Sequence, residues 1–594
     1  METIQGLKRT NYCGDLRAAD EGREVTLFGW VQRQRDLGQL IFVDLRDRTG
    51  IVQLAFDEAT DRAVFEKAFT LRSEFVVAAR GTVRIRSAKN ADLPTGDVEV
   101  AVLELRILNK AETPPFEIVE NSSTAELTRL KYRYLDLRRP DLQRNLLMRH
   151  RIAKVTRDYF DSQGFIELET PMLIKSTPEG ARDFLVPSRV HQGEFYALPQ
   201  SPQLYKQLSM VAGFDRYMQL ARCFRDEDLR ADRQPEFTQI DLEMSFVDVE
   251  DVLAIGEGFM KKLFRDVLDV DVPLPLPRLS YNEAMARYGS DKPDTRFGME
   301  IIDLSEAVTG CGFGVFTSAL EAGGTVRCIT AKNAVNTLTR KEVDKLTEMV
   351  RGIGAKGLAW ARLTTEGVAS SFAKFMSEEE MTRLLTAAGA EQGDVVLIVA
   401  DKTRVTLPVL GALRLAVADK IGIERKGYNL LWITEFPFFE WNDETEQYDA
   451  MHHPFTSPLD ESIPYLDSDP DKVYAKAYDL VLNGVELASG SIRITDPELQ
   501  AKMFRALGLS DEEAAEKFGF LTNAFRFGAP PHGGMGIGLD RLVMQMLEAN
   551  TLRDVIAFPK VQNMTEPMTD CPAPVDAVQL ADLGLVVKVE ENNG

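Results

Sequence analysis

Two arginines in acidic surroundings are the residues of this sequence whose types and spacing are best suited to chemistry. Arg225 precedes two acids in Phe224-Arg225-Asp226-Glu227, and Arg541 ends the segment Gly538-Leu539-Asp540-Arg541 about three hundred residues later. A guanidinium group presents a planar fork of donors that matches phosphate oxygens, and it keeps its charge at physiological pH. The two arginines therefore have suitable chemistry for a phosphorylated ligand.

Two acids could complete such a site. Asp479 and Glu486 stand seven residues apart in the segment 478–486. Carboxylate oxygens suit Mg²⁺ that is shared with the phosphates of a substrate. The same spacing also fits a hairpin with two exposed acids, so the pair alone leaves both interpretations open.

Several further segments contain charged residues in apolar surroundings. Acids and apolar residues alternate in the run 233–243, and a lysine, an arginine and a histidine lie in the segments 199–207, 490–493 and 451–456. Each such residue taken alone is more often structural: a helix-face lysine, a surface-strand arginine or a satisfied core histidine.

Taken together and in this order, the segments resemble motifs of class II aminoacyl-tRNA synthetases. The stretch 164–171 resembles motif 1, the stretches 224–227 and 233–243 resemble motif 2, and 538–541 resembles motif 3. The segments 177–184, 199–207, 451–456 and 490–493 are similar to the aspartyl-tRNA synthetase family, and the insertion after 289–294 is similar to its bacterial branch. The resemblance covers nearly the whole chain.

The resemblance implies roles for individual residues. The substrate aspartate would contact Glu179, Gln203, Lys206, Arg225, Asp241, His452 and Arg493. ATP would contact Arg225, Glu227, Gln234, Phe237, Glu486 and the run Gly538, Leu539, Asp540 and Arg541, with the adenine stacked on Phe237. Arg225, Arg541 and Glu486 would be the catalytic residues, and Asp479 and Glu486 would hold Mg²⁺ with the ATP.

The choice of amino acid also follows from physical chemistry. A site that buries two cations, Arg493 and Lys206, leaves them unpaired when a neutral amide replaces a carboxylate. Such polar discrimination can reach ~10⁴-fold, which would reject asparagine. One departure concerns the ATP site, because Ala488-Ser489-Gly490 stands where the family often has a run of glycines. Two small side chains should be tolerated there.

Composition agrees with a large multidomain protein. The chain has 594 residues, 44% of them hydrophobic, which allows about four domains. No apolar run approaches the length of a membrane span, the first ten residues have no signal-peptide core, and five scattered cysteines indicate a reducing cytoplasm. The net charge of -22 is unfavourable for nucleic-acid binding, but residues 1–110 carry 17 basic and 17 acidic residues and are neutral. The most basic segment, 129–151, could face a nucleic acid or pair with acids elsewhere.

The fold class that we expect is α/β and multidomain. Residues 1–110 show five strands with one helix after the third, which is typical of an OB-fold β-barrel that binds an anticodon. A hinge follows at 111–140, then the first part of an antiparallel-sheet catalytic domain (141–296), an inserted α+β domain (297–418), the second catalytic part (419–560) and a C-terminal extension (561–594). The barrel residues with suitable chemistry for single-stranded bases are Arg33, Arg35, Leu37, Phe42 and Gln53.

Three functions are compatible with these patterns. The leading hypothesis is an aspartate–tRNA ligase that uses ATP, Mg²⁺ and L-aspartate, charges tRNA-Asp and works as a cytoplasmic homodimer without membrane contact; dimerisation is implied by motif 1 alone. The alternative is a relaxed synthetase that also charges tRNA-Asn. Members of that kind often have a histidine at the position of Leu37, so leucine favours strict specificity. A non-catalytic RNA-binding paralogue is disfavoured because Arg225, Glu486, Arg493 and Arg541 are all present.

Overall fold

The computed structural model describes residues 2–177, 180–230, 232–442 and 446–588, and these form two compact units. The first unit contains residues 1–151, 228–235 and 546–581, and the second contains 152–227, 236–545 and 582–594. Glu179, expected to contact aspartate, lies outside the described residues. No helix in the described part of the chain is both long and apolar enough to span a membrane.

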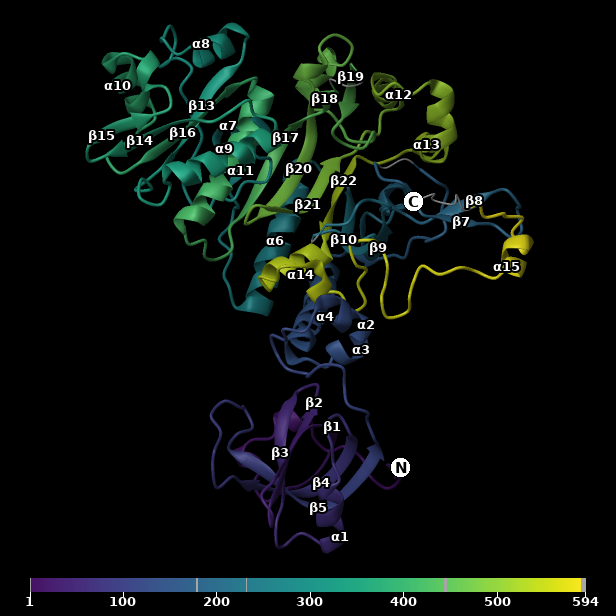
Figure 1. The fold of residues 1–594 in the computed structure, drawn as a ribbon. Helices are drawn as coiled ribbons and strands as arrows, with labels where there is room; N and C mark the ends of the chain where they lie inside the picture. The colour runs from purple at the N-terminus through teal and green to yellow at the C-terminus, as the bar shows by residue number, and fades with distance from the viewer. Residues whose placement is uncertain (1, 178–179, 231, 443–445, 589–594) are drawn as a thin grey trace. The chain divides into compact units, whose positions relative to one another are not determined.

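The amino-terminal part of the first unit is a closed five-stranded barrel, drawn in purple in Figure 1. Its elements are β1 (Glu24–Asp36), β2 (Ile41–Asp47), β3 (Gly50–Phe56), α1 (Arg62–Phe69), β4 (Val76–Ile85) and β5 (Val98–Asn109), with the strands ordered β1-β2-β3-β5-β4. Alternate residues such as Val25, Leu27 and Val43 point into a fully buried core, as the period of two along a strand requires. The barrel confirms the predicted OB-fold.

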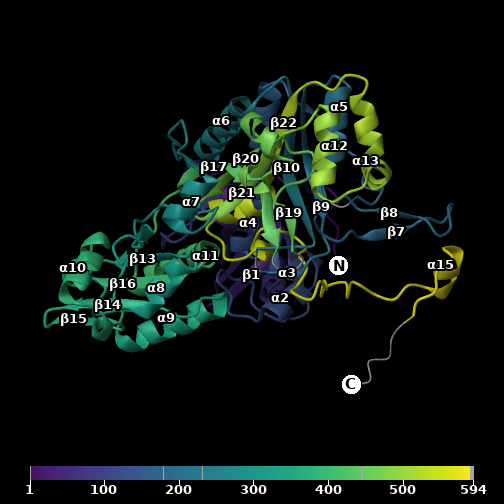
Figure 2. The same cartoon turned by 90° about the horizontal axis from the view of Figure 1, so that it is seen from above.

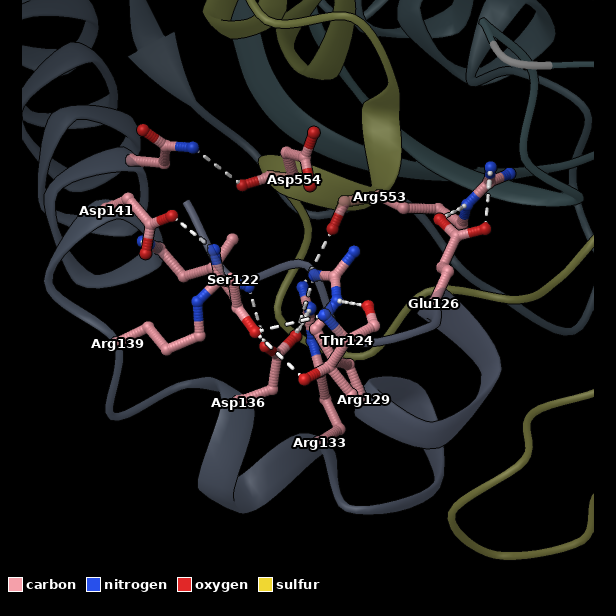
Figure 3. Close-up of polar contacts among 12 residues, drawn as sticks. Ser122, Thr124, Glu126, Arg129, Arg133, Asp136, Arg139, Asp141, Arg553 and Asp554 are labelled. Carbon is pink, nitrogen blue, oxygen red and sulfur yellow. Dashed lines mark hydrogen bonds and ion pairs between the residues drawn. The ribbon is translucent and has the colours of Figure 1, made fainter. Parts of the chain in front are cut away.

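Arginines of the predicted hinge pair with acids inside the first unit. The hinge helices are α2 (Glu126–Lys131) and α3 (Arg133–Asp136), followed by α4 (Pro140–Ser162). Asp136 has no exposed area and accepts from Nη1 of Arg133 at 2.6 Å and of Arg139 at 2.9 Å. Another donor of Arg133 reaches the carbonyl oxygen of Arg553 at 2.7 Å, in the turn Leu552–Asp554 (Figure 3). Its remaining contacts are with the carbonyl oxygens of Ile556 at 2.9 Å and Ala557 at 2.8 Å. This part of the basic segment is therefore internal structure.

An eight-stranded sheet forms the centre of the second unit. In order across the sheet its strands are β11 (Arg278–Ser280), β17 (Leu430–Pro437), β20 (Tyr474–Leu482), β21 (Val485–Ile492), β22 (His532–Gly538), β10 (Glu236–Ser245), β9 (Arg216–Phe224) and β6 (Ile166–Glu167). Neighbours from β17 to β9 are antiparallel, and only the outermost pairs are parallel. The antiparallel catalytic sheet that we expected is confirmed.

Helices cover the sheet and fix the residues beneath them. Helix α6 (Val249–Leu268) packs against β20 and β22. Helix α5 (Gln203–Val211) packs with α12 (Pro497–Ala506) and α13 (Asp511–Phe525), as Figure 2 shows. A buried aromatic cluster joins these helices, in which the rings of Phe504 and Phe518 stack at 5.5 Å and Phe455 meets both edge-on. Helix α14 (Leu539–Met546) follows β22 directly.

The inserted segment forms its own five-stranded sheet with a hydrophobic core on each face. Its elements are β12 (Ile302–Asp303), α8 (Gly314–Glu321), β13 (Thr325–Ala331), α9 (Arg340–Ile353), β14 (Ala359–Thr364), β15 (Gly367–Ser370), α10 (Glu378–Ala387), β16 (Val395–Asp401) and α11 (Thr403–Ile421). Helix α11 packs on α7 (Tyr281–Tyr288), which lies against β17 of the large sheet (Figure 1). The segment has the mixed helix and strand content that we expected.

Short elements complete the described chain. They are the hairpins β7 (Leu185–Pro187) with β8 (Phe195–Ala197) and β18 (Phe439–Asn442) with β19 (Gln447–Ala450), the short helix α15 (Ala577–Asp582), and 3-10 turns at Cys13–Asp15, Ala18–Asp20, Ala373–Phe375, Asp460–Tyr465 and Pro470–Lys472.

Candidate active site

One face of the large sheet presents polar residues on adjacent strands. Residues directly opposite each other on neighbouring strands share a face. One row across β20, β21, β22, β10 and β9 is Asp479, Ser489, Gly536, Asp241 and Gln219, and the next row is Ala477, Ser491, Gly534, Glu243 and Tyr217. Gly534 and Gly536 stand in the middle of these rows and add no side chain to the face. A Cβ on Gly534 would come within 2.1 Å of the Leu242 carbonyl oxygen, so the strand backbones pack closely here. The face is thus a shallow floor edged by charged side chains.

Three buried ion pairs lie at one end of this floor. Nζ of Lys206, on α5, donates to Oδ1 of Asp241 at 2.8 Å and lies 3.4 Å from Oε2 of Glu243. Arg493 donates from Nε and Nη2 to the two oxygens of Glu243, at 2.8 and 3.1 Å. Lys206 and Arg493 are 2% and 4% exposed, so both cations depend on these carboxylates for compensation.

The two carboxylates differ in their pKa values. Burial raises the pKa of Asp241, and Lys206 offsets this only in part. Burial acts in the same direction on Glu243, but Arg493 and Lys206 outweigh it and lower the pKa of this group. Glu243 therefore stays ionised and compensates the charge of Arg493, while Asp241 takes up a proton more readily than Glu243.

Four residues expected to bind aspartate each have a buried polar atom that lacks a hydrogen-bond partner within the described part of the chain. These atoms are Oδ2 of Asp241, Nε2 of Gln203, Nε2 of His452 and Nε of Arg225. Buried polar groups are nearly always satisfied in folded proteins. An unpaired carboxylate oxygen, an amide donor and a guanidinium donor are the groups that a small zwitterionic ligand could satisfy. These four atoms are thus available to form hydrogen bonds with a substrate.

The two adjacent histidines have different surroundings. The ring of His452 meets the ring of Phe436 edge-on at 5.4 Å, and burial lowers its pKa to about 4. Nε2 of His453 lies 2.8 Å from Nη1 of Arg493, while its Nδ1 accepts from the backbone N–H of Phe455 at 3.2 Å. Burial and the nearby Arg493 lower the pKa of His453, so both rings are neutral near pH 7.

His453, Glu243 and Ser491 contact Arg493 and were missed by the sequence reasoning. A signal existed for two of them. In a strand, residues two apart share a face, so Asp241 and Glu243 must point the same way, as must Ser491 and Arg493. Nothing in the pair His452-His453 shows which ring faces the arginine.

Residues expected to bind ATP lie just after β9, on β10 and at the junction of β22 with α14. The guanidinium of Arg225 lies over the ring of Phe237, 5.2 Å from its centroid. Arg541 donates from Nη1 to the carbonyl oxygen of Glu486 at 2.8 Å, and Asp540 accepts from the backbone N–H of Thr238 at the same distance. The strand ends at Gly538, so Leu539, Asp540 and Arg541 form the first turn of the helix.

Two other expected ATP residues are placed differently. Glu227 follows the end of β9 in the second unit and is partly buried. Gln234 belongs to the first unit, where its amide forms two hydrogen bonds with the backbone of Lys560, from Nε2 at 3.0 Å and to Oε1 at 2.8 Å. The amide of Gln234 is thus held by the backbone of its own unit.

The acids Asp479 and Glu486 lie on the two strands of the β20–β21 hairpin. Asp479 is 8% exposed. The pairing of β20 with β21 shifts register between Leu480 and Val481, so that Leu487 has no cross-strand partner and Glu486 stands opposite Val481. Burial and the Glu486 carboxylate raise the pKa of Asp479 well above its usual value, while Ser489, its cross-strand partner, acts in the opposite direction. Two carboxylates that repel in a buried place fit a divalent cation. Within the described ranges no group of three or more His, Cys, Asp or Glu side chains is arranged to hold a metal ion.

The barrel of the first unit gathers the expected base-reading residues on its outer face. Arg35 donates from Nη2 to Asp44 at 3.0 Å and to Gln53 at 2.9 Å, and its guanidinium lies 5.6 Å from the centroid of the Phe42 ring. Gln53 donates in turn to Glu99 at 2.6 Å. Arg33 is exposed on the same face as Asp44, and Leu37 is 68% exposed in the β1–β2 turn. Asp44 and Glu99 were not predicted.

Known families and relatives match both units. Residues 125–562 match the family described as tRNA synthetases class II (D, K and N), and residues 25–108 match the OB-fold nucleic acid binding domain. The chain belongs to the class II tRNA synthetases. The aspartate–tRNA ligase of Ruminiclostridium cellulolyticum is 59% identical over 99% of this chain and 100% of its own length.

Two further relatives differ in their stated substrates. The aspartate–tRNA(Asp/Asn) ligase of Lachnoclostridium phytofermentans is 56% identical over 99% of this chain and 98% of its own. A crystal structure of asparaginyl-tRNA synthetase from Pyrococcus horikoshii, complexed with asparaginyl-adenylate, has a TM-score of 0.58 at 19% identity and covers 93% of this chain and 98% of that one. The likeness to this structure concerns the fold alone.

Proposed function

We propose that this synthetase is an aspartate–tRNA ligase, which joins L-aspartate to ATP as aspartyl-adenylate and then transfers it to the 3′ end of tRNA-Asp. The observation that carries the proposal is the pair of buried cations, Lys206 and Arg493, at one end of the sheet floor. The names of the full-length relatives at 54–59% identity support the same amino acid.

The side-chain carboxylate of the substrate would bind between Arg493 and Lys206. Because Nδ1 of His453 already accepts a hydrogen bond, the neutral ring carries its proton on Nε2, where it faces the donor Nη1 of Arg493. Two donors in contact are poorly satisfied. A carboxylate oxygen that approached both nitrogens would accept from both of them, which favours an anion at this point.

The α-groups of the substrate would meet the unsatisfied atoms of the site. Oδ2 of Asp241 is an acceptor suited to the ammonium group, and Nε2 of Gln203 is a donor suited to a carboxylate oxygen. Asparagine would place an amide NH₂ against cationic donors that need an acceptor. Sites of this type reject the wrong analogue by ~10⁴-fold.

Adenylation requires the α-carboxylate of aspartate to attack the α-phosphorus of ATP while pyrophosphate leaves. Arg225 would neutralise charge at the α-phosphate and Arg541 at the γ-phosphate, so that positioning and fixed charge supply the acceleration. Mg²⁺, held by Asp479 and Glu486, would supply further neutralisation of the phosphates when bound. Phe237 offers its ring to the adenine in place of the Arg225 guanidinium that now covers it.

The second part of the proposal concerns whether the enzyme charges tRNA-Asp alone or also tRNA-Asn. The outer barrel face with Arg33, Arg35, Phe42 and Gln53 would read the anticodon by stacking and hydrogen bonds. The exposed position of Leu37 lets its side chain meet a base, and we propose that leucine here limits the enzyme to tRNA-Asp. A relaxed enzyme is the second candidate, because relatives at 54–56% identity carry the name aspartate–tRNA(Asp/Asn) ligase.

Aminoacylation with purified protein and labelled aspartate, using tRNA-Asp and tRNA-Asn transcripts in parallel, tests both halves. We expect charging of tRNA-Asp alone, and we expect Leu37→His to raise charging of tRNA-Asn without changing the rate with tRNA-Asp. Equal charging of both transcripts by the unaltered protein would refute the strict specificity. Charging of neither, beside an active control synthetase, would refute the ligase.

We further propose that the enzyme is a homodimer that acts in the cytoplasm. Support for the dimer comes from large apolar side chains that are exposed on the second unit, Ile166 on the edge strand β6 and Leu173, Leu185 and Val190 in the chain that follows it. Exposed apolar surface can mark an interaction site. Light scattering on the unaltered protein and on Ile166→Lys tests this, with a dimer expected for the first and a monomer for the second.

A further inference from the structure

The two chain connections of the inserted domain meet at the turn of the hairpin that carries Asp479 and Glu486. The incoming connection is 294–296 and the outgoing one is 425–429. The hairpin turn is Asn483-Gly484, a two-residue turn in which both residues have positive φ, 54° and 86°. Asparagine followed by glycine is the pair that favours this type of turn. The turn fixes the register of the two strands on which the acids lie.

Asparagine side chains connect the turn to the outgoing connection. Oδ1 of Asn483 accepts from the backbone N–H of Asn429 at 2.8 Å, and its Nδ2 donates to the carbonyl oxygen of Gly427 at 3.0 Å. The backbone N–H of Asn483 donates to the Asn429 carbonyl oxygen at 3.1 Å. The turn is therefore held on three hydrogen bonds by a segment that leads out of the inserted domain.

The incoming connection packs on the same turn from another side. A Cβ on Gly484 would lie 3.1 Å from Cβ of Asp294 and 3.5 Å from its backbone nitrogen, so the two backbones are in close contact. Arg296 grips both oxygens of Asp294, at 2.9 and 2.8 Å, and Nδ2 of Asn429 donates to Oγ1 of Thr295 at 2.8 Å. The two connections are thus bonded to each other as well as to the hairpin.

We propose that Asn483 and Asn429 are positioning residues for the cation site at Asp479 and Glu486, and that they fix this site to the two connections of the inserted domain, 294–296 and 425–429. The proposal rests on the proposed function, in which these acids hold Mg²⁺ with ATP. A displacement of the two connections would shift the turn and with it the separation of the two carboxylates. Residues that orient metal ligands typically contribute ~10- to 100-fold to metal affinity.

The test is binding of Mn²⁺ together with α,β-methylene-ATP, measured by electron paramagnetic resonance, beside binding of aspartate without nucleotide, measured by calorimetry. Asn483→Gly keeps the positive φ and removes both side-chain hydrogen bonds of the turn. Asn429→Ala leaves the turn intact and removes only the bond to Thr295. Asn333→Gly is the matched control, a loop asparagine of the inserted domain with a φ of 53°.

We expect Asn483→Gly to weaken Mn²⁺ binding ~10-fold and Asn429→Ala to weaken it by a smaller factor, with aspartate affinity and the Asn333→Gly control within about twofold of the unaltered protein. A Mn²⁺ affinity of Asn483→Gly equal to that of the control, or a loss shared equally with aspartate binding, would overturn the proposal. Glu486→Gln distinguishes a failure of the metal assignment from a failure of the positioning role. If it binds Mn²⁺ as well as the unaltered protein, the metal assignment falls and this proposal falls with it; if it alone loses Mn²⁺, only the positioning role falls.

Discussion

Replacement of Arg493 by lysine tests how the pocket selects a carboxylate. Lysine keeps the positive charge but has no planar fork. In the structure the fork gives two hydrogen bonds to Glu243, at 2.8 and 3.1 Å, and Nη1 remains beside Ser491 and His453. Lysine could keep only one bond to Glu243 and could not grip the substrate at the same time.

The magnitude follows from the bonds that are lost. A hydrogen bond to a charged group is worth about 1.5–3 kcal/mol, and at least one to Glu243 or to the substrate disappears. Allowing for part of a second bond, transition-state stabilisation should fall by about 2–4 kcal/mol, which lowers kcat/KM for aspartate by about 30- to 900-fold.

The assay is aspartate-dependent exchange of labelled pyrophosphate into ATP, with the thermal midpoint recorded for each variant. Arg222→Lys is the matched control, because Arg222 also pairs with a glutamate, Glu236, but with 40% and 32% of the two side chains exposed. Exposed pairs are worth under about 1 kcal/mol, so this variant should stay within a few-fold of the unaltered enzyme. Less than a tenfold loss for a well-folded Arg493→Lys would refute the carboxylate-gripping role.

Three further predictions concern stability. Asp136→Asn should lower the free energy of unfolding by about 3–5 kcal/mol in denaturant titrations, because it leaves Arg133 buried without its anion and Arg139 with Asp141 alone; Glu126→Gln, which loses a half-exposed partner of Arg553, should cost under about 1 kcal/mol. Gly490→Ala should cost about 1–3 kcal/mol, since its Cβ would lie 2.3 Å from the Gly534 carbonyl oxygen; an unchanged thermal midpoint would contradict the close strand contact. Burial lowers the pKa of His452 from 6.5 to about 4 in the folded protein, so the unfolded chain takes up this proton first as the pH falls. The free energy of unfolding should therefore fall by about 3 kcal/mol between pH 6.5 and 4, with no contribution from His452 above that window. His452→Phe should remove this part of the pH dependence when unfolding is measured against pH.

The elements of the fold were largely predictable because burial imposes a period on each strand. In the barrel, Val25, Leu27, Gly29 and Val31 stand at every second position of β1 and are buried, and this pattern with one helix after the third strand predicts the observed topology. In the site, Arg225 and Phe237 lie together, as do Lys206 and Asp241, at places that the motifs predict to be near one another.

Other contacts depend on long-range pairing that local patterns do not contain. Gln234 pairs with the backbone of Lys560, a partner that no sequence spacing indicates. The fork of Arg493 is already held by Glu243, because a buried guanidinium needs an anion before any substrate arrives. The hinge arginines Arg133 and Arg139 read as a basic surface until Asp136 is seen between them.

The most direct test of the central claim is pyrophosphate exchange by the unaltered protein with aspartate and with asparagine as alternative substrates. Two buried cations predict exchange with aspartate and a kcat/KM for asparagine lower by ~10³-fold or more. Exchange that is equally fast with asparagine, or absent with aspartate under conditions where a control synthetase works, would contradict the assignment of Lys206 and Arg493 to the substrate carboxylate.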